Sequence, residues 1–240
     1  TWDSIATMQE MTMEICEHAT TDASKTLVDA RGDTPYKSYE VFKAKDGNCW
    51  MRDNLAVSGT VPKANVAGGT DGTYTLVQGA NYWDGSTLGS KYKLGYGCYY
   101  NFDAATTETG ATSGNTNATA SICPTGGENN ANWVLPKTGE SGNKYEGAGS
   151  FAALLNAHGG QTIAMVTGSE LGFQYGGNVS SNTLYNAGYG GYYWSRTTYD
   201  SLYAYFFYFY SNGNVNPTYS SNRNYGQSIR CLYPSTSTKA

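Results

Sequence analysis

Aromatic and apolar residues occupy both parities of the segment SLYAYFFYFY near the carboxyl end of the chain. Alternate side chains of a β-strand point to opposite faces of a sheet, so one apolar parity normally marks the buried face. Here one parity carries Tyr203, Tyr205, Phe207 and Phe209, and the other carries Ala204, Phe206, Tyr208 and Tyr210. The pattern predicts a strand that either lies between two layers of the interior or uses its second face to contact something other than water.

Three segments have the spacing or the caps of helices. In TMQEMTMEICEHA, Thr7 and Glu10 form a capping-box pattern before apolar residues near helical spacing, which predicts a short helix over residues 7–18. SFAALLNAHGG has Ser150 as its cap and two glycines at its end, and it is the clearest helix after the first. A short helix is also expected to begin at Asn101 in NFDAATT.

The segment KTLVDARGDTPYKSYEVFKAKDGNCWMRDNL predicts two strands joined at RGDTP, followed by a second turn at KDGN. Arg31, Gly32 and Asp33 are also a candidate integrin ligand, but a turn needs the same residues, and we favour the turn. Residues 56–95 are rich in Gly, Thr, Asn and Ser and predict an ordered but irregular surface insertion. Beyond residue 160, short apolar runs bounded by Gly or Asn predict strands and loops.

Length and charge restrict the class of protein. With 240 residues the chain is long enough to bury a core of its own, and we favour a single domain. The formal net charge of -4, without a cluster of Lys and Arg, excludes a nucleic-acid groove. No run approaches the roughly 18 apolar residues of a membrane helix, so we expect no direct membrane insertion, and no signal peptide is recognisable.

Five cysteines are spread along the chain without a CxxC pair, which excludes the zinc-ribbon and thioredoxin patterns. Low charge with abundant Tyr, Asn, Ser and Gly is typical of exported proteins, in which disulfides form. Because the number is odd, at least one thiol is left over. The five are Cys16, Cys49, Cys98, Cys123 and Cys231.

Seven phrases of the sequence together resemble one known family. In chain order they are TMQEMTMEIC, LVDARGDTPYKSYEVFKAKDGNCWMRDNL, YYNFDAATT, SICPTG, WVLP, YYWSRTTYDS and SIRCL, and they span residues 7–233. They resemble the Fibrobacter succinogenes major paralogous domain of bacterial surface proteins. That family resembles the C-type lectin fold, in the branch shared with formylglycine-generating enzymes and with the variable proteins of diversity-generating retroelements.

The resemblance implies an α+β, C-type-lectin-like fold with two helices, a small twisted antiparallel sheet and long irregular loops. The two helices would be NFDAATT and SFAALLNAHGG. Residues 1–20 would form an amino-terminal helix packed on the domain, residues 21–234 the C-type-lectin-like domain, and residues 235–240 a tail.

The resemblance also implies two disulfides, Cys123 with Cys231 and Cys16 with Cys49. Such bridges would tie the loop before WVLP to the last strand, and the amino-terminal helix to the DGNCW strand. Cys98 would then be left over. We favour a buried small hydrophobe there over an intermolecular link or a reactive thiol, since free cysteines are usually buried.

The sequence offers little to catalysis or metal binding. His18 and His158 are the only histidines, and neither accompanies a nucleophile elbow or stands at the spacing of a zinc site. Of the reactive thiols that the oxidase branch carries near the carboxyl end, only Cys231 is present, and the calcium motifs of sugar-binding C-type lectins are missing. The remaining acids are scattered, so we expect no enzyme, no cofactor and no metal; they include Asp84, Asp103, Glu170 and Asp200.

Residues 185–233 carry twelve of the 22 tyrosines among Ser, Gly and Asn, which is the composition of a recognition surface. Phe206, Phe207, Phe209 and Trp194 are expected in the core. The residues expected to contact a ligand are Tyr193, Arg196, Tyr199, Asp200, Tyr203, Tyr205, Tyr208, Tyr210, Asn212, Asn214, Tyr219, Asn222, Arg223 and Asn224.

These observations predict a non-enzymatic, extracellular or cell-surface ligand-binding domain of a bacterial surface protein, such as an adhesin or a receptor-binding domain. Its partner would be an extracellular protein or glycan, and a monomer is favoured. The resemblance to retroelement-diversified proteins implies that the tyrosine-rich surface is a candidate for diversification. Two alternatives stay open: a structural subunit of a surface assembly or filament, and an enzyme of the oxidase branch.

Overall fold

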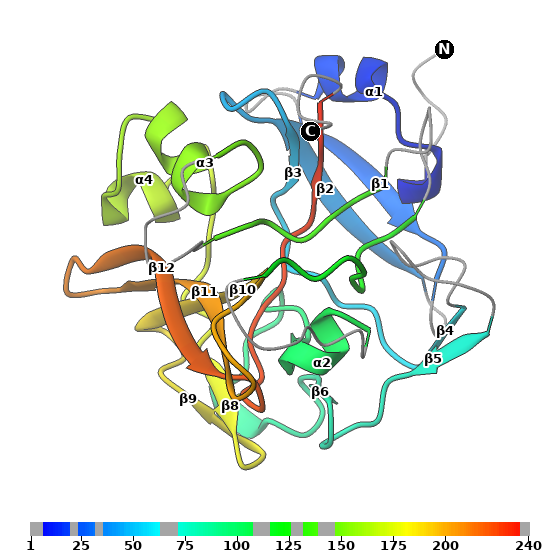
Figure 1. Cartoon of the computed structure of the whole chain (residues 1–240), viewed down its shortest axis with the longest axis vertical. Helices are drawn as coiled ribbons and strands as arrows, with labels where there is room; N and C mark the ends of the chain where they lie inside the picture. Colours follow the sequence, from blue (N-terminus) through cyan, green and yellow to red (C-terminus); the bar gives the residue numbers. More distant parts are fainter. Residues whose placement is uncertain are drawn as a thin grey trace.

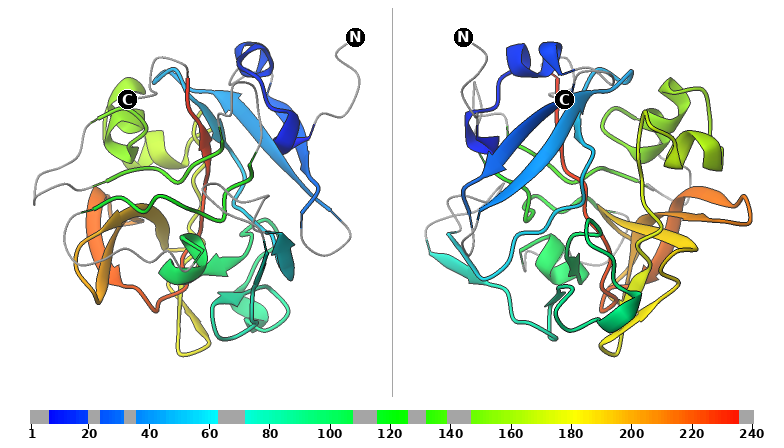
Figure 2. Two further views of the ribbon diagram at one scale, coloured as in Figure 1. Left: turned by 45° about the vertical axis from the view of Figure 1, so that its right-hand side comes forward. Right: turned by 180° about the vertical axis from the view of Figure 1, so that it is seen from behind.

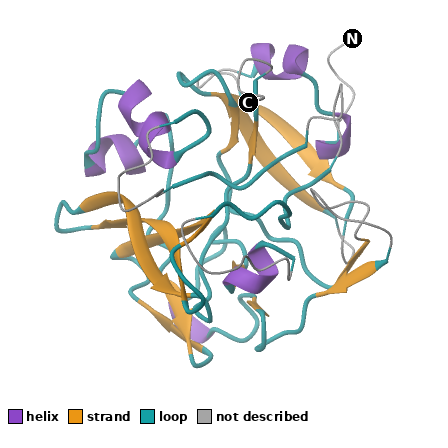
Figure 3. Ribbon diagram, viewed as in Figure 1, coloured by secondary structure: helices purple, strands orange, loops and turns teal. Residues whose placement is uncertain are grey.

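The computed structural model describes residues 7–19, 24–31, 36–62, 72–107, 116–125, 132–138 and 147–235. Within these ranges the chain is α+β, with a few short helices and several small antiparallel sheets joined by long irregular connections (Figures 1 and 3). No helix among the described residues is long and apolar enough to cross a membrane.

Each α-helix in the described part of the chain begins at a Thr, Asn or Ser whose side-chain oxygen accepts a backbone N–H of the first turn. The capping residues are Thr12, Asn101, Ser150 and Thr162. The helices are α1 (Met13–His18), α2 (Phe102–Ala105), α3 (Phe151–Ala157) and α4 (Ile163–Thr167), with the 3-10 turns η1 (Met8–Glu10) and η3 (Gly89–Lys91).

The helices at Asn101 and Ser150 are confirmed, and two other expectations need correction. The helix predicted over residues 7–18 is divided, because Thr12 is extended and starts α1 after η1 has ended. Beyond residue 160 only strands and loops were expected, yet Thr162 starts α4. Of the four α-helices in the described chain, α2 and α3 are the two that the resemblance implied, α1 lies in the amino-terminal segment expected to be helical, and only α4 is additional.

A four-stranded antiparallel sheet has the strand order β1-β2-β3-β13. Its strands are β1 (Lys25–Asp29), β2 (Lys37–Lys43), β3 (Cys49–Met51) and β13 (Leu232–Tyr233). The hairpin predicted around RGDTP is present, although residues 32–35 lie outside the described ranges. Arg31 is buried, and its guanidinium bonds the carboxylate of Asp29 and the carbonyl oxygen of Ile122, so this side chain is not displayed to a receptor.

A second antiparallel sheet has the order β10-β11-β12, with β10 (Gly190–Thr198), β11 (Tyr203–Tyr210) and β12 (Val215–Asn222). Two-stranded ribbons complete the sheet structure of the described residues. They are β4 (Thr60–Pro62) with β5 (Thr73–Thr75), β6 (Tyr82–Trp83) with β7 (Tyr99–Tyr100), and β8 (Asn178–Ser180) with β9 (Thr183–Tyr185).

The segment 226–233 joins these sheets to one another. It forms β-bridges from Gly226 to Val179, from Gln227 to Tyr100 and from Ser228 to Tyr193, and then continues into β13 beside β3. In Figures 1 and 2 it is the red segment that runs through the middle of the molecule. The last residues of the fold therefore hold the three-stranded sheet against the rest of the chain.

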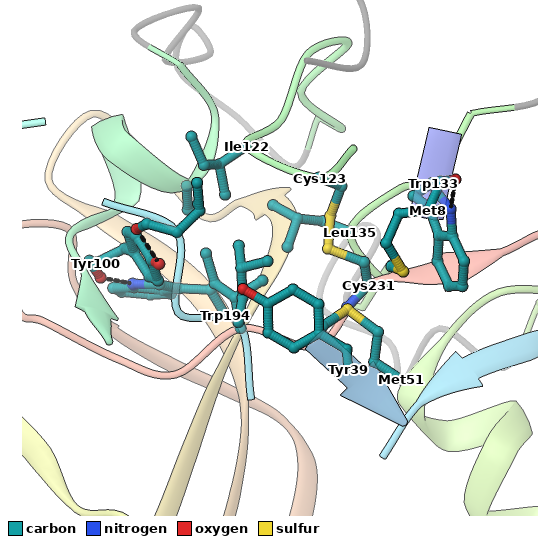
Figure 4. Close-up of a cluster of buried hydrophobic side chains, with 14 of the residues drawn as sticks. Met8, Tyr39, Met51, Tyr100, Ile122, Cys123, Trp133, Leu135, Trp194 and Cys231 are labelled. Carbon is teal, nitrogen blue, oxygen red and sulfur yellow. Dashed lines mark hydrogen bonds between the residues drawn. A yellow bond between two sulfur atoms is a disulfide. The ribbon is translucent and has the colours of Figure 1, made fainter. Parts of the chain in front are cut away.

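The largest buried cluster surrounds the Cys123–Cys231 disulfide, with Trp133 and Trp194 on its two sides (Figure 4). Cys16 and Cys49 form the second disulfide, so both bridges implied by the resemblance are present. The segment 56–95 was expected to be a surface insertion, but it also contributes to this cluster, because its apolar side chains alternate inward. Those buried side chains are Val57, Val61, Tyr74, Leu76 and Tyr82.

Candidate ligand-binding face

The middle of β11 is buried on both of its faces. On one face, the ring of Phe207 packs against Phe151 and Phe173, with centroid distances of 5.0 and 5.2 Å. On the other face, Phe206 packs against Trp194, whose ring contacts Phe102 of α2. The expected core positions of the phenylalanines and of Trp194 are confirmed.

Beyond Phe206, other elements no longer cover the face of β11 on which Phe206 lies, and four partly exposed tyrosines occupy this face of the sheet. We call Tyr192, Tyr208, Tyr210 and Tyr219 the tyrosine platform. The ring of Tyr208 is at its centre, with centroid distances of 5.3 Å to Tyr192, 6.3 Å to Tyr210 and 5.6 Å to Tyr219. Tyr219 is 52% exposed, and the other three are partly buried.

Strand register brings the platform together. Tyr192 pairs with Tyr208, and Gly190 pairs with Tyr210, so these side chains share one face of β10 and β11. A register shift between Phe206 and Tyr208 places Tyr219 of β12 opposite Phe206 and beside Tyr208.

Gly190 lets two platform rings lie low over the sheet. A Cβ atom at this position would be 2.7 Å from Cε2 of Tyr192, closer than such atoms approach, and 3.1 Å from Cδ2 of Tyr210, which is a tight contact. Both rings therefore occupy the space above the Gly190 backbone that a side chain would otherwise fill. These two rings consequently lie against the strand.

The platform is uncharged. Burial, followed by the neighbouring Tyr208, raises the pKa of the Tyr192 hydroxyl to about 12, and burial also raises the pKa of Tyr208. The Tyr192 hydroxyl accepts a hydrogen bond of 2.9 Å from Nδ2 of Asn186. The register also places Asn216 and Ser221 on this face. At neutral pH, the platform therefore offers neutral rings, hydroxyls and amides.

A second group of predicted residues lies at the opposite end of β11. The Asp200 carboxylate accepts the backbone N–H groups of Leu202 and Tyr203, both at 2.7 Å, and so closes the turn between β10 and β11. Tyr199 is exposed and packs edge-on against Tyr205 with a centroid distance of 5.4 Å. Tyr205 itself is only 5% exposed, so it supports this end of the strand and is not displayed.

The predicted asparagines mainly shape turns. Oδ1 of Asn212 accepts the N–H of Asn214 at 3.1 Å, and Oδ1 of Asn222 accepts the N–H of Asn224 at 2.9 Å. These short-range bonds fix the loops at the two ends of β12. They leave the exposed amides of Asn214 and Asn224 on the surface.

Both predicted arginines are held by the protein's own groups. The Arg223 guanidinium lies 3.2 Å from the Asp103 carboxylate and sits over the ring of Phe102. Arg196 is partly buried in β10, and its backbone N–H donates to the carbonyl oxygen of Pro136.

Tyr193 was expected at the ligand surface, but the structure places it in the core. Its hydroxyl donates to Oδ1 of Asn54 at 2.9 Å and accepts the backbone N–H of Gln174 at 3.0 Å. The fully buried guanidinium of Arg230 lies over its ring. Sequence reasoning did not include the adjacent Tyr192 among the ligand-contacting residues. Gly190 and Gly191 come directly before Tyr192, and because glycine has no side chain to cover a neighbouring ring, they were the signal that could have found it.

His158 is the one buried histidine, and both of its ring nitrogens are engaged. Nε2 accepts the backbone N–H of Lys45 at 3.0 Å, which leaves Nδ1 to donate to Oε2 of Glu170 at 2.9 Å. The hydrogen bond from His158, followed by the one from the Lys45 ammonium, lowers the pKa of Glu170. His158, Glu170 and Lys45 thus join the end of α3 to the turn after β2. With both ring nitrogens bonded in this way, the His158 imidazole has no lone pair left to act as a general base.

No group of three potential metal-ligating side chains occurs in the ranges that the structure describes. Asp84 accepts the backbone N–H of Ser86 at 2.9 Å and so shapes its own turn. Cys98 is unpaired and buried, and burial raises the pKa of its thiol to about 12. The expectation of a buried small hydrophobe at Cys98 is confirmed.

No family model, no curated protein and no solved structure matches the chain. Its function is therefore inferred from the chemistry and geometry of its own residues. Of the groups of residues described above, the tyrosine platform is the one in which partly exposed aromatic rings lie together on paired strands.

Proposed function

We propose that this chain is an extracellular ligand-binding domain of a bacterial surface protein, with a C-type-lectin-like fold, and that it binds its ligand on the tyrosine platform. The observation that carries the proposal is the arrangement of Tyr192, Tyr208, Tyr210 and Tyr219 as one continuous aromatic surface on paired strands. Contiguous exposed aromatic surface on a protein usually marks a contact site.

Rigidity supports this proposal. Three of the four rings come from β10 and β11, whose centre is packed on both faces. A ligand that docks on such a surface costs little side-chain entropy, because the rings are already ordered by packing. Tyrosine also has few rotatable bonds and a hydroxyl that tolerates water, as in antibody paratopes.

The disulfides support the location. Cys16–Cys49 and Cys123–Cys231 are the kind of bridges that persist in oxidising compartments, outside the cytosol. The resemblance of the sequence to a family of bacterial surface proteins leads to the same location. The order of the phrases SICPTG, WVLP, YYWSRTTYDS and SIRCL, and the Cys123–Cys231 bridge between the first and last of these phrases, support the C-type-lectin-like assignment.

The test is ligand capture by a matched set of variants. The protein is screened against host surface proteins and a glycan array, and each ligand found is then measured with Tyr219→Ala. We expect Tyr219→Ala to weaken capture about tenfold or more and to leave the melting temperature nearly unchanged, since Tyr219 is half exposed. Tyr185→Ala is the control, because Tyr185 is 46% exposed but lies on β9, outside the platform.

Capture by Tyr219→Ala that equals capture by the unchanged protein would contradict the proposal. Equal losses in Tyr219→Ala and Tyr185→Ala would also count against it, because a general effect on the surface or the fold would then explain both results.

A further inference from the structure

We infer that the ligand of the tyrosine platform is a neutral oligosaccharide whose sugar rings stack on the tyrosine rings, without help from a metal ion. This inference rests on the proposed function and narrows it to one chemical class. Three features of the platform lead to it: its shape, its area and its lack of charge.

The shape suits stacking. The interplanar angles are 28° between Tyr208 and Tyr210 and 32° between Tyr208 and Tyr219, while Tyr192 is tilted by 59° from Tyr208 and is nearly parallel to Phe206 at 14°. The rings of Tyr192 and Tyr210 both lie close to the Gly190 backbone. One face of a pyranose ring carries C–H groups, which contact the negative face of an aromatic ring favourably.

The spacing suits a chain of sugar units. Tyr208 lies 5.3 to 6.3 Å from the other three ring centroids. These distances are of the order of one pyranose unit, so successive sugars of a linear chain can each contact a different tyrosine.

The area is too small for a stable protein partner on the platform alone. Tyr219 is 52% exposed and the other three are more buried, so together they expose less than about two tyrosine side chains, roughly 500 Å² at most. A standard protein–protein interface needs about 800 Å² from each partner. A short oligosaccharide covers a surface of the smaller size.

The lack of charge selects a neutral ligand. Protein interfaces are enriched in arginine and rely on charge complementarity, whereas every platform residue is a tyrosine, and none is an acid or a base of the Asp, Glu, Lys or Arg type. Arg223 and Asp103 pair with each other at the opposite end of β11, beside Leu202. Asn216 and Ser221 lie on the same face and carry the amide and hydroxyl groups that bond sugar hydroxyls.

The experiment is an array of neutral, sialylated and sulfated oligosaccharides, probed with the whole chain in buffer containing EDTA. Dissociation constants of the best neutral oligosaccharide are then measured by calorimetry. Tyr210→Ala and Tyr219→Ala each remove one ring of the platform. Tyr203→Ala is the matched control, because Tyr203 is 41% exposed on the same strand but belongs to the opposite parity of β11.

We expect binding of neutral oligosaccharides that EDTA leaves unchanged. Loss of one stacking ring in Tyr210→Ala or Tyr219→Ala is expected to weaken binding about tenfold. Tyr208→Phe keeps its ring and is expected to stay within about threefold of the unchanged protein. Tyr203→Ala is expected to bind normally. Near-ultraviolet circular dichroism identifies any variant that has lost its fold. If either Tyr210→Ala or Tyr219→Ala is lost in this way, the other variant decides the result.

Each contrary result has a distinct meaning. If no neutral oligosaccharide binds, but a host protein binds the unchanged chain and not Tyr219→Ala, the glycan inference is overturned and the proposed function stands. Loss of sugar binding in EDTA, or in Tyr203→Ala but not in the platform variants, also overturns the inference. If neither proteins nor glycans depend on the platform, the inference and the proposed function fail together.

Discussion

Tyr192 and Tyr193 are adjacent in β10 and have opposite surroundings. Tyr193 faces the layer that contains Phe173 and Phe209, where Asn54 and Gln174 bond its hydroxyl. Tyr192 points to the other face, beyond the part that α2 covers, and its hydroxyl reaches Asn186 near the surface. Two residues of one type therefore differ in role because a single residue step reverses the face.

The buried guanidinium of Arg230 is bonded mainly by backbone atoms. Arg230 is fully buried without a carboxylate partner, but its guanidinium donates to the carbonyl oxygens of Leu171 and Gly172 and to Oδ1 of Asn54. It also stacks over Phe173. Such a set of bonds offsets much of the cost of removing a charge from water.

Burial also decides the reactivity of Cys98. Since the pKa of its thiol is raised to about 12, almost none of the reactive thiolate exists at pH 8 in the folded protein. We predict that Ellman's reagent does not react with the native chain at this pH, and that it titrates a single thiol per chain in guanidinium. Fast reaction of the native chain would show that Cys98 is accessible and ionised.

At the scale of elements, β11 has one face in the core and a second face that passes from the core to the tyrosine platform. Its odd-numbered positions Phe207 and Phe209 join the cluster around Phe151 and Phe173, which α3 helps to form. Its even-numbered positions are covered only as far as Phe206, where Phe102 of α2 and Trp194 complete the core. The platform begins where this cover ends.

This division predicts unequal losses of stability within one strand. Phe207→Ala removes a fully buried ring and is expected to lower the free energy of unfolding by about 3 to 5 kcal/mol. Tyr208→Ala removes a partly exposed ring and is expected to cost less than half as much. Urea denaturation measures both values, and similar losses in the two variants would contradict the assignment of Tyr208 to the platform.

At the scale of the whole molecule, the segment 226–233 and the two disulfides connect parts that are distant in sequence. Cys123–Cys231 closes a loop with a sequence separation of 108, and Cys16–Cys49 closes one of 33. The first bridge lies in the largest buried cluster and fixes the carboxyl end of the chain beside Trp133 and Tyr233.

The disulfide that closes the longer loop is expected to contribute more to the free energy of unfolding than the disulfide that closes the shorter loop. On the chain-entropy model, replacing both Cys123 and Cys231 by Ala lowers the free energy of unfolding by about 4 to 5 kcal/mol, and replacing Cys16 and Cys49 lowers it by about 3 to 4 kcal/mol. Denaturant unfolding of the two double variants measures the difference. A larger loss from the shorter loop would mean that packing around Cys16 and Cys49, and not loop entropy, dominates.

Local signals in the sequence predicted much of the local structure. The capping residues Asn101 and Ser150 start helices, and the runs on either side of RGDTP form a hairpin, because these features depend on neighbours within a few residues. The same reasoning missed α4, whose five residues follow a Thr cap but have too little periodicity to recognise. It also joined η1 and α1, which the extended Thr12 separates.

The sequence by itself determined that the carboxyl-terminal strands are aromatic on both faces, that the chain has a surplus thiol, and where the helices at Asn101 and Ser150 begin. Only the tertiary structure decided which aromatic rings are covered. Parity separates the two faces of β11, but the cover comes from α2, α3 and the segment 226–233, which meet the strand through contacts distant in sequence. For this reason Tyr193 and Tyr205 are buried, while Tyr192, absent from the sequence-based set, completes the platform.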